Sequence, residues 1–487
     1  MLLVKGVEWL QMEVIMKTSK FKFADLHCHP ILKTFGHSFS SKGDGIINRS
    51  HIWYCNPPTV FTKTLNALTG LTKFTQADFT TLSKANVKVA VVSLYPLEKG
   101  FFTNGFMKGL PLAHFANLVT SIGFKRVRHL QKHTDYFLDL VNEYNFFKNS
   151  CTDLEIEGQT KKWRLAGSWI EVEKILDDDH CMAVIPTIEG GHVFNTGLTS
   201  FGRPTQEWEM FQNIEKVKNW EYPPLFITLA HNFNNDLCGH ARNLDRLGPL
   251  VNQLENINTG FTQLGIKVVR ALLDDAKRPV FIDIKHMSLK SRLQYYDLVE
   301  NEYRDKVPVL VSHGAVTGVD LSYKQNTFIP PGMFSAEDIN FYDEELVIIA
   351  KTGGLFSLQM DSRRFAHRKL IRKSLRQVFQ PNAHKHSAIA IWLQLQHIAE
   401  VLDSHQLFAW GTVCIGSDFD GTINPLNGIW TAEQLPLLAE ELLLLAANYL
   451  QGKNGLIHSE NRTISPEEIV ERFIFRNVKD FLATHYK

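Results

Sequence analysis

Short apolar segments rich in β-branched residues recur along the chain and predict strands. There are eight of them, and nearly all of their positions are apolar rather than alternating between apolar and polar. Continuous apolar runs of this length are typical of parallel strands that are buried on both faces. The predicted strands are 21–25, 87–94, 183–188, 225–229, 280–284, 309–311, 354–358 and 412–415.

Segments with helical periodicity lie between several of these strands, for example 262–274 and 388–404. Eight strands that alternate with helices predict an α/β fold of the (β/α)8 TIM-barrel type. Three stretches are too long for one crossover, and we interpret 97–180, 323–345 and 360–385 as insertions on the barrel.

The chain shows no internal repeat, no low-complexity tract and no clear linker. We therefore expect an N-terminal extension of residues 1–20, followed by a single barrel domain over residues 21–487. The segment 115–147, inside the first insertion, has a helical pattern.

Composition narrows the class of protein. The chain has 487 residues, of which 44% are hydrophobic, so it can bury a large core. Its formal net charge is +1, so it lacks the basic excess of a nucleic-acid-binding protein. None of the six cysteines forms a CxxC pair, which argues against a zinc knuckle or a disulfide scaffold.

Neither the first 20 residues nor the longest apolar run predicts membrane insertion. Residues 1–20 contain Glu8 and Glu13 within their apolar stretch and do not resemble a signal peptide, and the longest apolar run, 435–447, is interrupted by two glutamates. We expect a cytoplasmic protein with no nucleic-acid or membrane partner.

Polar residues with metal-binding chemistry follow the predicted strands. His27 and His29 come after the first strand and, being two positions apart, share one side of it. Alone, each motif also has a simple structural explanation, such as a turn histidine, a glutamate at a glycine turn or a Ser-Asp helix cap. The full set is His27, His29, Glu189, His286, His313 and Asp418.

The combination of these six residues favours a catalytic metal site. The carboxyl ends of the strands are where barrel enzymes place their active sites, and imidazoles with carboxylates suit zinc and similar ions. Six ligands exceed the need of one tetrahedral zinc with an open position. They suit two divalent ions about 3.5–4 Å apart, with a carboxylate and a hydroxide between them.

At this point the sequence resembles the renal (membrane) dipeptidase family of the amidohydrolase superfamily. The matching segments occur in family order and leave 97–180 without a counterpart. They are DLHCHP, IEGGH, ITLAHN, TGFTQLGIKVVRAL, IDIKHMS, VLVSHGA, DEELVIIAKTGGLFSL, IGSDFDG and FRNVKDFL.

The resemblance implies a role for each metal ligand. His27 and the residue at position 29 would hold one metal, Glu189 would bridge both metals, and His286 and His313 would hold the second. Two zinc ions are the expected cofactor, and the expected substrate is a dipeptide or a related amide. Homodimers are common among such barrels, and the resemblance extends this expectation to the present chain.

The resemblance also implies the catalytic groups. Asp418 would lie close to the first metal, accept a proton from the attacking water and pass it to the leaving amine. His231 would contact the substrate carbonyl and its oxyanion. Asp25 and Asp420 are expected to support these groups from behind rather than to bind metal.

Two positions depart from the family pattern. His29 stands where the family has Asp, which makes the site more positive. Ile339 stands where the family has the Arg that clamps the substrate carboxylate, and a bidentate clamp requires a guanidinium. The absence places free dipeptides in doubt unless Arg363, Arg364 or Lys324 supplies the cation.

Two other functions stay open. The first is an amidohydrolase that acts on another amide, an ester or a lactone, and the second is a non-catalytic barrel that binds a metal or another ligand. His192 and His240 match no ligand motif, and we expect them at the surface.

Overall fold

The computed structural model describes residues 21–40, 47–103, 108–244, 251–274, 278–304, 306–324, 327–330, 332–365 and 378–487. The predicted N-terminal extension of residues 1–20 lies outside the described residues.

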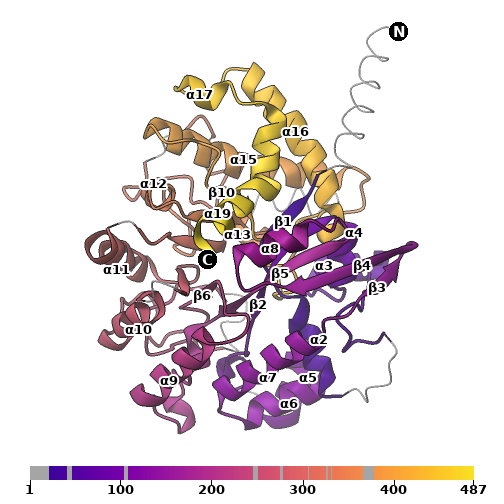
Figure 1. Ribbon diagram of the computed structural model, residues 1–487, viewed down its shortest axis with the longest axis vertical. Coiled ribbons are helices and arrows are strands. Elements are labelled where there is room, and N and C mark those ends of the chain that lie inside the picture. The colour runs from indigo at the N-terminus through magenta and orange to yellow at the C-terminus, as the bar shows by residue number, and fades with distance from the viewer. Residues whose placement is uncertain are drawn as a thin grey trace.

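Eight parallel strands, hydrogen-bonded in sequence order, form the centre of the molecule (Figure 1). Each corresponds to one of the eight predicted apolar runs, within a few residues at its ends. The strands are β1 (Phe23–Cys28), β2 (Val87–Leu94), β5 (Cys181–Glu189), β6 (Phe226–Thr228), β7 (Phe281–Asp283), β8 (Leu310–Gly314), β9 (Leu355–Leu358) and β10 (Val413–Ile415).

The first and last strands meet and nearly close the sheet into a barrel. Cys28 pairs in parallel with Phe419, the backbone N–H of His29 donates to the carbonyl of Phe419 at 2.8 Å, and the N–H of Asp418 donates to the carbonyl of His27 at 2.9 Å. The predicted (β/α)8 barrel is confirmed.

Helices connect the strands and surround them (Figure 1). They are α2 (Pro30–Ser38), α3 (Val60–Thr69), α4 (Phe79–Lys84), α5 (Gly109–Thr120), α6 (Phe124–Lys132), α7 (Tyr136–Asn149), α8 (Trp169–Leu176), α9 (Glu207–Lys218), α10 (Gln263–Leu273), α11 (Leu289–Leu298), α12 (Asp343–Lys351), α13 (Ser362–Phe365), α15 (Ala383–Ser404), α16 (Leu435–Gln451), α17 (Ser459–Arg462), α18 (Pro466–Glu471) and α19 (Asn477–His485).

The first long insertion contains α5, α6 and α7, as its helical pattern predicts, and also a hairpin that the pattern does not predict. The hairpin strands β3 (Leu154–Ile156) and β4 (Gln159–Leu165) are antiparallel, and β4 lies parallel to the first half of β5 (Figure 1). Polar side chains occupy most of β4, and only Trp163 and Leu165 are buried, so the segment lacks the apolar run of a barrel strand.

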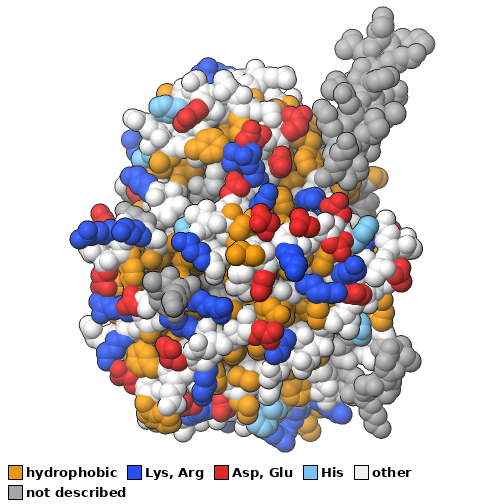
Figure 2. Space-filling model, viewed as in Figure 1, with side chains coloured by type: hydrophobic (Ala, Val, Ile, Leu, Met, Phe, Trp, Pro, Cys, Tyr) orange, Lys and Arg blue, Asp and Glu red, His pale blue; other side chains and the backbone are white. Residues whose placement is uncertain are grey.

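The surface matches the even charge balance of the sequence. On the face shown in Figure 2, basic and acidic side chains are interspersed rather than gathered by sign. Among the described helices, none has both the length and the apolar character needed to cross a membrane.

Candidate metal centre

The ends of β1 and β10 hold the first predicted ligands in place. The carboxylate of Asp25 accepts hydrogen bonds from the N–H of His27 at 3.2 Å and from the N–H of Ser417 at 2.9 Å. Asp25 therefore joins the two strand ends. The side chain of Cys28 points away from His27 and His29, toward the carbonyl of Val91.

Two pairs of imidazole nitrogens converge in the barrel mouth. His27 Nε2 lies 3.1 Å from His29 Nε2, and His286 Nε2 lies 3.2 Å from His313 Nε2. Two nitrogens that share one tetrahedral zinc at about 2.0–2.1 Å lie about 3.3 Å apart. The spacing in both pairs therefore fits two imidazoles on a common ion.

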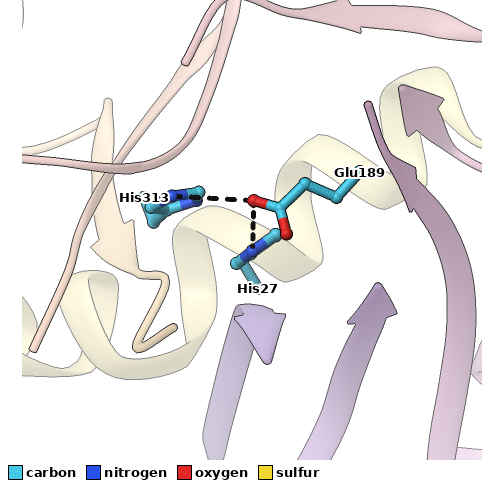
Figure 3. A group of neighbouring side chains, drawn as sticks. All are labelled: His27, Glu189 and His313. Carbon is cyan, nitrogen blue, oxygen red and sulfur yellow. Dashed lines mark ion pairs between the residues drawn. The ribbon is translucent and has the colours of Figure 1, made fainter. Parts of the chain in front are cut away.

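The carboxylate of Glu189 lies between the two histidine pairs. Oε2 is 3.2 Å from His29 Nε2, while Oε1 is 3.6 Å from His27 Nε2, 3.8 Å from His286 Nε2 and 3.9 Å from His313 Nε2. Figure 3 shows His27 and His313 facing the same oxygen of Glu189. The carboxylate thus lies within 4 Å of ring nitrogens from both histidine pairs.

Asp418 completes the group from the end of β10. Its Oδ1 lies 3.5 Å from His29 Nε2, and its Oδ2 lies 3.9 Å from His313 Nε2. Its side chain is 14% exposed, against 0–4% for His27, His29, Glu189 and His313, so it lies nearest to solvent of these five. Burial raises the pKa of Asp418, which suits a carboxyl that accepts and releases a proton.

Backbone conformation brings two of these side chains into the site. His286 has φ of 66° and Asp418 has φ of 58°, in the left-handed region that residues with a Cβ seldom adopt. Such strain is typical of functional positions. Gly421 follows closely, and a Cβ there would lie 2.0 Å from Asp418 Oδ1 and 2.9 Å from the ring of His29.

The electrostatics favour the neutral imidazole that metal binding needs at His286 and His313, but not at His29. Burial, with the neighbouring His231 and Lys285, holds the pKa of His286 well below its usual range, and burial with His27 does the same for His313. Both imidazoles are therefore neutral, as metal binding requires. Against the effect of burial, the carboxylates of Glu189 and Asp418 raise the pKa of His29 to about 10, so His29 must lose a proton when it binds a cation.

These residues fit a divalent metal. Three groups have ligand atoms within 4.8 Å of one another: His27, Glu189 and His313; His27, His29 and Asp418; and Glu189, His231 and His286. Glu189 and His27 each belong to two groups, so the clusters are continuous. The donor set of imidazoles and carboxylates matches the preferences of zinc.

His231 lies between Glu189 and a second carboxylate, Glu98, which sequence reasoning missed. Its Nε2 is 3.4 Å from Glu189 Oε1, and its Nδ1 is 2.7 Å from Glu98 Oε2. Glu98 also accepts hydrogen bonds from the backbone N–H groups of Asn232 and Phe233 and from the hydroxyl of Tyr95. Burial would raise the pKa of Glu98, but His231 outweighs it and lowers the pKa to about 2. Glu98 is thus ionised and fixes the orientation of His231.

Asp420 supports the site without contacting the histidines. Its carboxylate accepts hydrogen bonds from Lys33 Nζ at 2.6 Å and from the N–H groups of Gln76 and Ala77 at 2.9 and 2.8 Å. It therefore anchors the loop before α4 to the end of β10.

Two histidines that we expected at the surface are buried. His192 is 3% exposed and packs its ring 4.7 Å from that of Tyr136, and His240 is fully buried beside the backbone of Gln253. The expectation was wrong because the loops that follow the strands fold over one another at the barrel mouth.

Ile339, at the position where the resemblance expects the arginine clamp, is buried and cannot contact a substrate. Ile339 is 1% exposed, Lys324 is exposed, and Arg363 pairs with Asp361 at 2.6 Å. Arg364 instead approaches the site, since it donates to the carbonyl of Asn243, whose side chain lies 3.1 Å from His286 Nδ1.

Lys285 is a second cation near the centre that sequence reasoning missed. Its Nζ is buried and makes no hydrogen bond to the described residues. Burial, together with Arg364, lowers its pKa to about 7. Its place immediately before His286 was visible in the sequence, but a lysine after a strand has no single interpretation.

Comparison with known proteins identifies the fold. No family model and no curated protein matches the chain. Among solved structures, a dipeptidase of metallopeptidase family M19 aligns with 87% of this chain and 94% of its own, at 13% identity and a TM-score of 0.50. A metallopeptidase from Rhodobacter sphaeroides, bound to a phosphinate mimic of L-Ala-D-Ala, aligns with 96% and 99%, also at 13% identity and 0.50. The resemblance to the dipeptidase family is supported at the level of the fold.

Proposed function

We propose that the protein is a metal-dependent amidohydrolase that cleaves a peptide or related amide bond at a centre for two divalent ions. The observation that carries this proposal is the placement of Glu189 between two pairs of imidazole nitrogens, each pair 3.1–3.2 Å apart. The fold shared with metallopeptidases supports it.

His27, His29 and Asp418 would hold one ion, His286 and His313 the other, and Glu189 would bridge them. Zinc is the ion that this donor set favours. When bound, a pair of such ions polarises a carbonyl oxygen and lowers the pKa of water toward neutrality.

The chain's own residues would then manage protons and charge. Asp418 lies nearest to solvent of the residues around Glu189 and has a raised pKa, so it can take a proton from water and deliver it to the leaving amine. Burial opposes charge on His231, but Glu189 and Glu98 outweigh it and raise the pKa of His231. His231 can therefore donate a hydrogen bond to the oxygen on which negative charge develops.

The substrate is proposed to be a small amide with a negatively charged end. Lys285, which directly precedes His286 and makes no hydrogen bond to the described residues, is the cation proposed to meet a carboxylate in place of the clamp lost at Ile339. Arg364 lies in the same region but already pairs with Glu337 at 3.2 Å. The loss of that clamp favours the alternative that the natural substrate is another amide, an ester or a lactone rather than a free dipeptide.

A substrate panel tests the proposal. Zinc-loaded protein is incubated with dipeptides, N-acyl amino acids, simple esters and lactones, and product is quantified by mass spectrometry. We expect turnover of at least one amide class and its loss in Asp418→Asn, with the fold retained and with zinc present at a concentration that saturates both proteins. Metal-loaded protein that cleaves none of these classes would contradict the proposal, and equal turnover by Asp418→Asn would exclude Asp418 as the proton carrier.

A further inference from the structure

A cavity that none of the proposed metal ligands lines lies beside Asp420 and α2. Its volume is about 360 Å³, within the range of pockets that hold small organic ligands. One face of α2, the 72–75 segment, the end of α5 and Asp420 line it, and none of the proposed metal ligands does.

Four cationic or potentially cationic side chains face this cavity: Lys33, His37, Arg49 and Lys73. Lys33 and His37 are one helical turn apart on α2, so they share a face. Lys33 pairs with Asp420 at 2.6 Å. Within the described part of the chain, neither Lys73 nor Arg49 forms an ion pair with a carboxylate.

On this face, Lys73 and His37 form hydrogen bonds to neutral oxygen atoms. Lys73 donates to the carbonyl of Leu118 and, at 2.9 Å, to the hydroxyl of Ser121, both neutral acceptors. His37 Nε2 lies 3.1 Å from the carbonyl of Ser121. Burial and the nearby Lys33 lower the pKa of Lys73, and burial and Arg49 lower the pKa of His37. The positive groups thus repel one another across the cavity.

The two carboxylates that face the cavity are already occupied. Asp78 accepts hydrogen bonds from the N–H and the hydroxyl of Thr81 at 2.9 and 2.6 Å. Asp420 accepts from Lys33 and from two backbone N–H groups. Neither carboxylate balances the charge of Lys73 or Arg49.

We propose that this cavity binds a small organic anion through a carboxylate or phosphate group held by Lys73, Lys33 and Arg49. Lysine and arginine are the side chains that proteins use for such groups. The half-buried Tyr54 also lines the cavity and provides surface for an organic portion. The inference does not rest on the proposed hydrolase activity, because the predicted event is binding.

Calorimetric titration of the full-length protein with inorganic phosphate tests the proposal, using zinc-loaded and chelator-treated samples. We expect binding in both samples. Lys73→Gln and Arg49→Gln should each weaken it by about tenfold or more, as the loss of one charged hydrogen bond predicts. Lys174→Gln removes an exposed lysine of α8, outside the cavity, and should leave binding unchanged.

Three results would overturn the proposal. The first is that phosphate does not bind to the native protein. The second is that the native protein, Lys73→Gln and Arg49→Gln all bind phosphate with equal affinity. The third is that binding disappears when the metal is removed, which would place the phosphate on the ions. Melting curves of the variants establish that they are folded. Each substitution removes a repelling charge. The melting temperatures of Lys73→Gln and Arg49→Gln should therefore fall no further below the native value than the melting temperature of Lys174→Gln does.

The same variants distinguish the source of the anion. If the anionic group belongs to the substrate, Lys73→Gln raises KM for acidic amides and leaves KM for neutral ones unchanged. If the anion is a separate molecule, Lys73→Gln weakens phosphate binding and changes neither KM. Both results require an anion in the cavity.

Discussion

His231 Nδ1 lies 2.7 Å from Glu98 Oε2, a contact between the loop after β2 and the loop after β6. Because the pKa of Glu98 is held near 2, its carboxylate can only accept, and the proton must lie on Nδ1 of His231. The Nε2 atom is thereby directed at Glu189 Oε1, 3.4 Å away. One buried carboxylate thus determines which nitrogen of His231 faces the reaction site.

Glu98→Gln should lower kcat/KM about tenfold to a hundredfold, the usual cost of losing a carboxylate that orients a site histidine. Glu98 helps to raise the pKa of His231. As the pH rises, the activity of the variant should therefore begin to fall at a lower pH than that of the native protein. The pH profile of kcat/KM measures this shift.

Glu173→Gln is the matched control for Glu98, because Glu173 is exposed on α8. Its profile should superimpose on that of the native protein. A Glu98→Gln profile of unchanged shape, with only a uniform loss of rate, would show that Glu98 does not set the protonation of His231.

Glu189→Gln should reduce the metal content of the protein. The variant keeps the size of the side chain but loses the charge that faces both histidine pairs. Equilibrium dialysis against limiting zinc should show weaker binding of both ions. Two ions held as tightly as in the native protein would exclude a bridging role for Glu189.

Gly421→Ala should weaken metal binding without unfolding the protein. The added methyl group would stand 2.0 Å from Asp418 Oδ1, so the carboxylate must move away from His29. We expect at least a tenfold loss of zinc affinity in competition with a chelating dye, because metal sites tolerate little displacement of their ligands. Native affinity in this variant would show that Asp418 does not contribute to metal binding.

Glu143→Gln should change how stability depends on pH. Glu143 is fully buried, accepts a hydrogen bond from the N–H of Tyr95, and has its pKa raised by burial from 4.5 to about 8. A carboxyl whose pKa is higher in the folded state binds its proton more tightly there, so the stability it contributes below pH 4.5 is lost as pH rises toward 8.

The native protein should therefore lose roughly 3 kcal/mol more than Glu143→Gln between pH 5 and pH 8. Denaturant titrations at both pH values measure the difference, with Glu173→Gln as the control. Parallel losses in all three proteins would mean that Glu143 is ionised at both pH values.

The barrel strands could be predicted from sequence because each is buried on both faces and is therefore an apolar run. The hairpin of β3 and β4 could not, since only Trp163 and Leu165 are buried in β4, so the segment has no continuous apolar run. Its first four residues, Gln-Thr-Lys-Lys, are all polar, so the alternation typical of a half-buried strand covers only its last residues.

The convergence of these side chains could be predicted by applying one rule, a polar residue at the carboxyl end of each strand. Glu98 follows β2 by four residues and was missed because that rule was not extended into the Tyr-Pro-Leu-Glu segment. The approach of Arg364 to Asn243 could not be foreseen, because it depends on how two long loops pack against each other.

The number of metal ions bound per chain tests the central claim most directly. Purified protein is incubated with zinc, freed of loose ions by gel filtration and analysed by plasma mass spectrometry. The geometry of two imidazole pairs about Glu189 predicts about two ions per chain, as in paired-metal hydrolases. One ion would restrict the site to a single pair, and a protein that retains no metal would contradict the account.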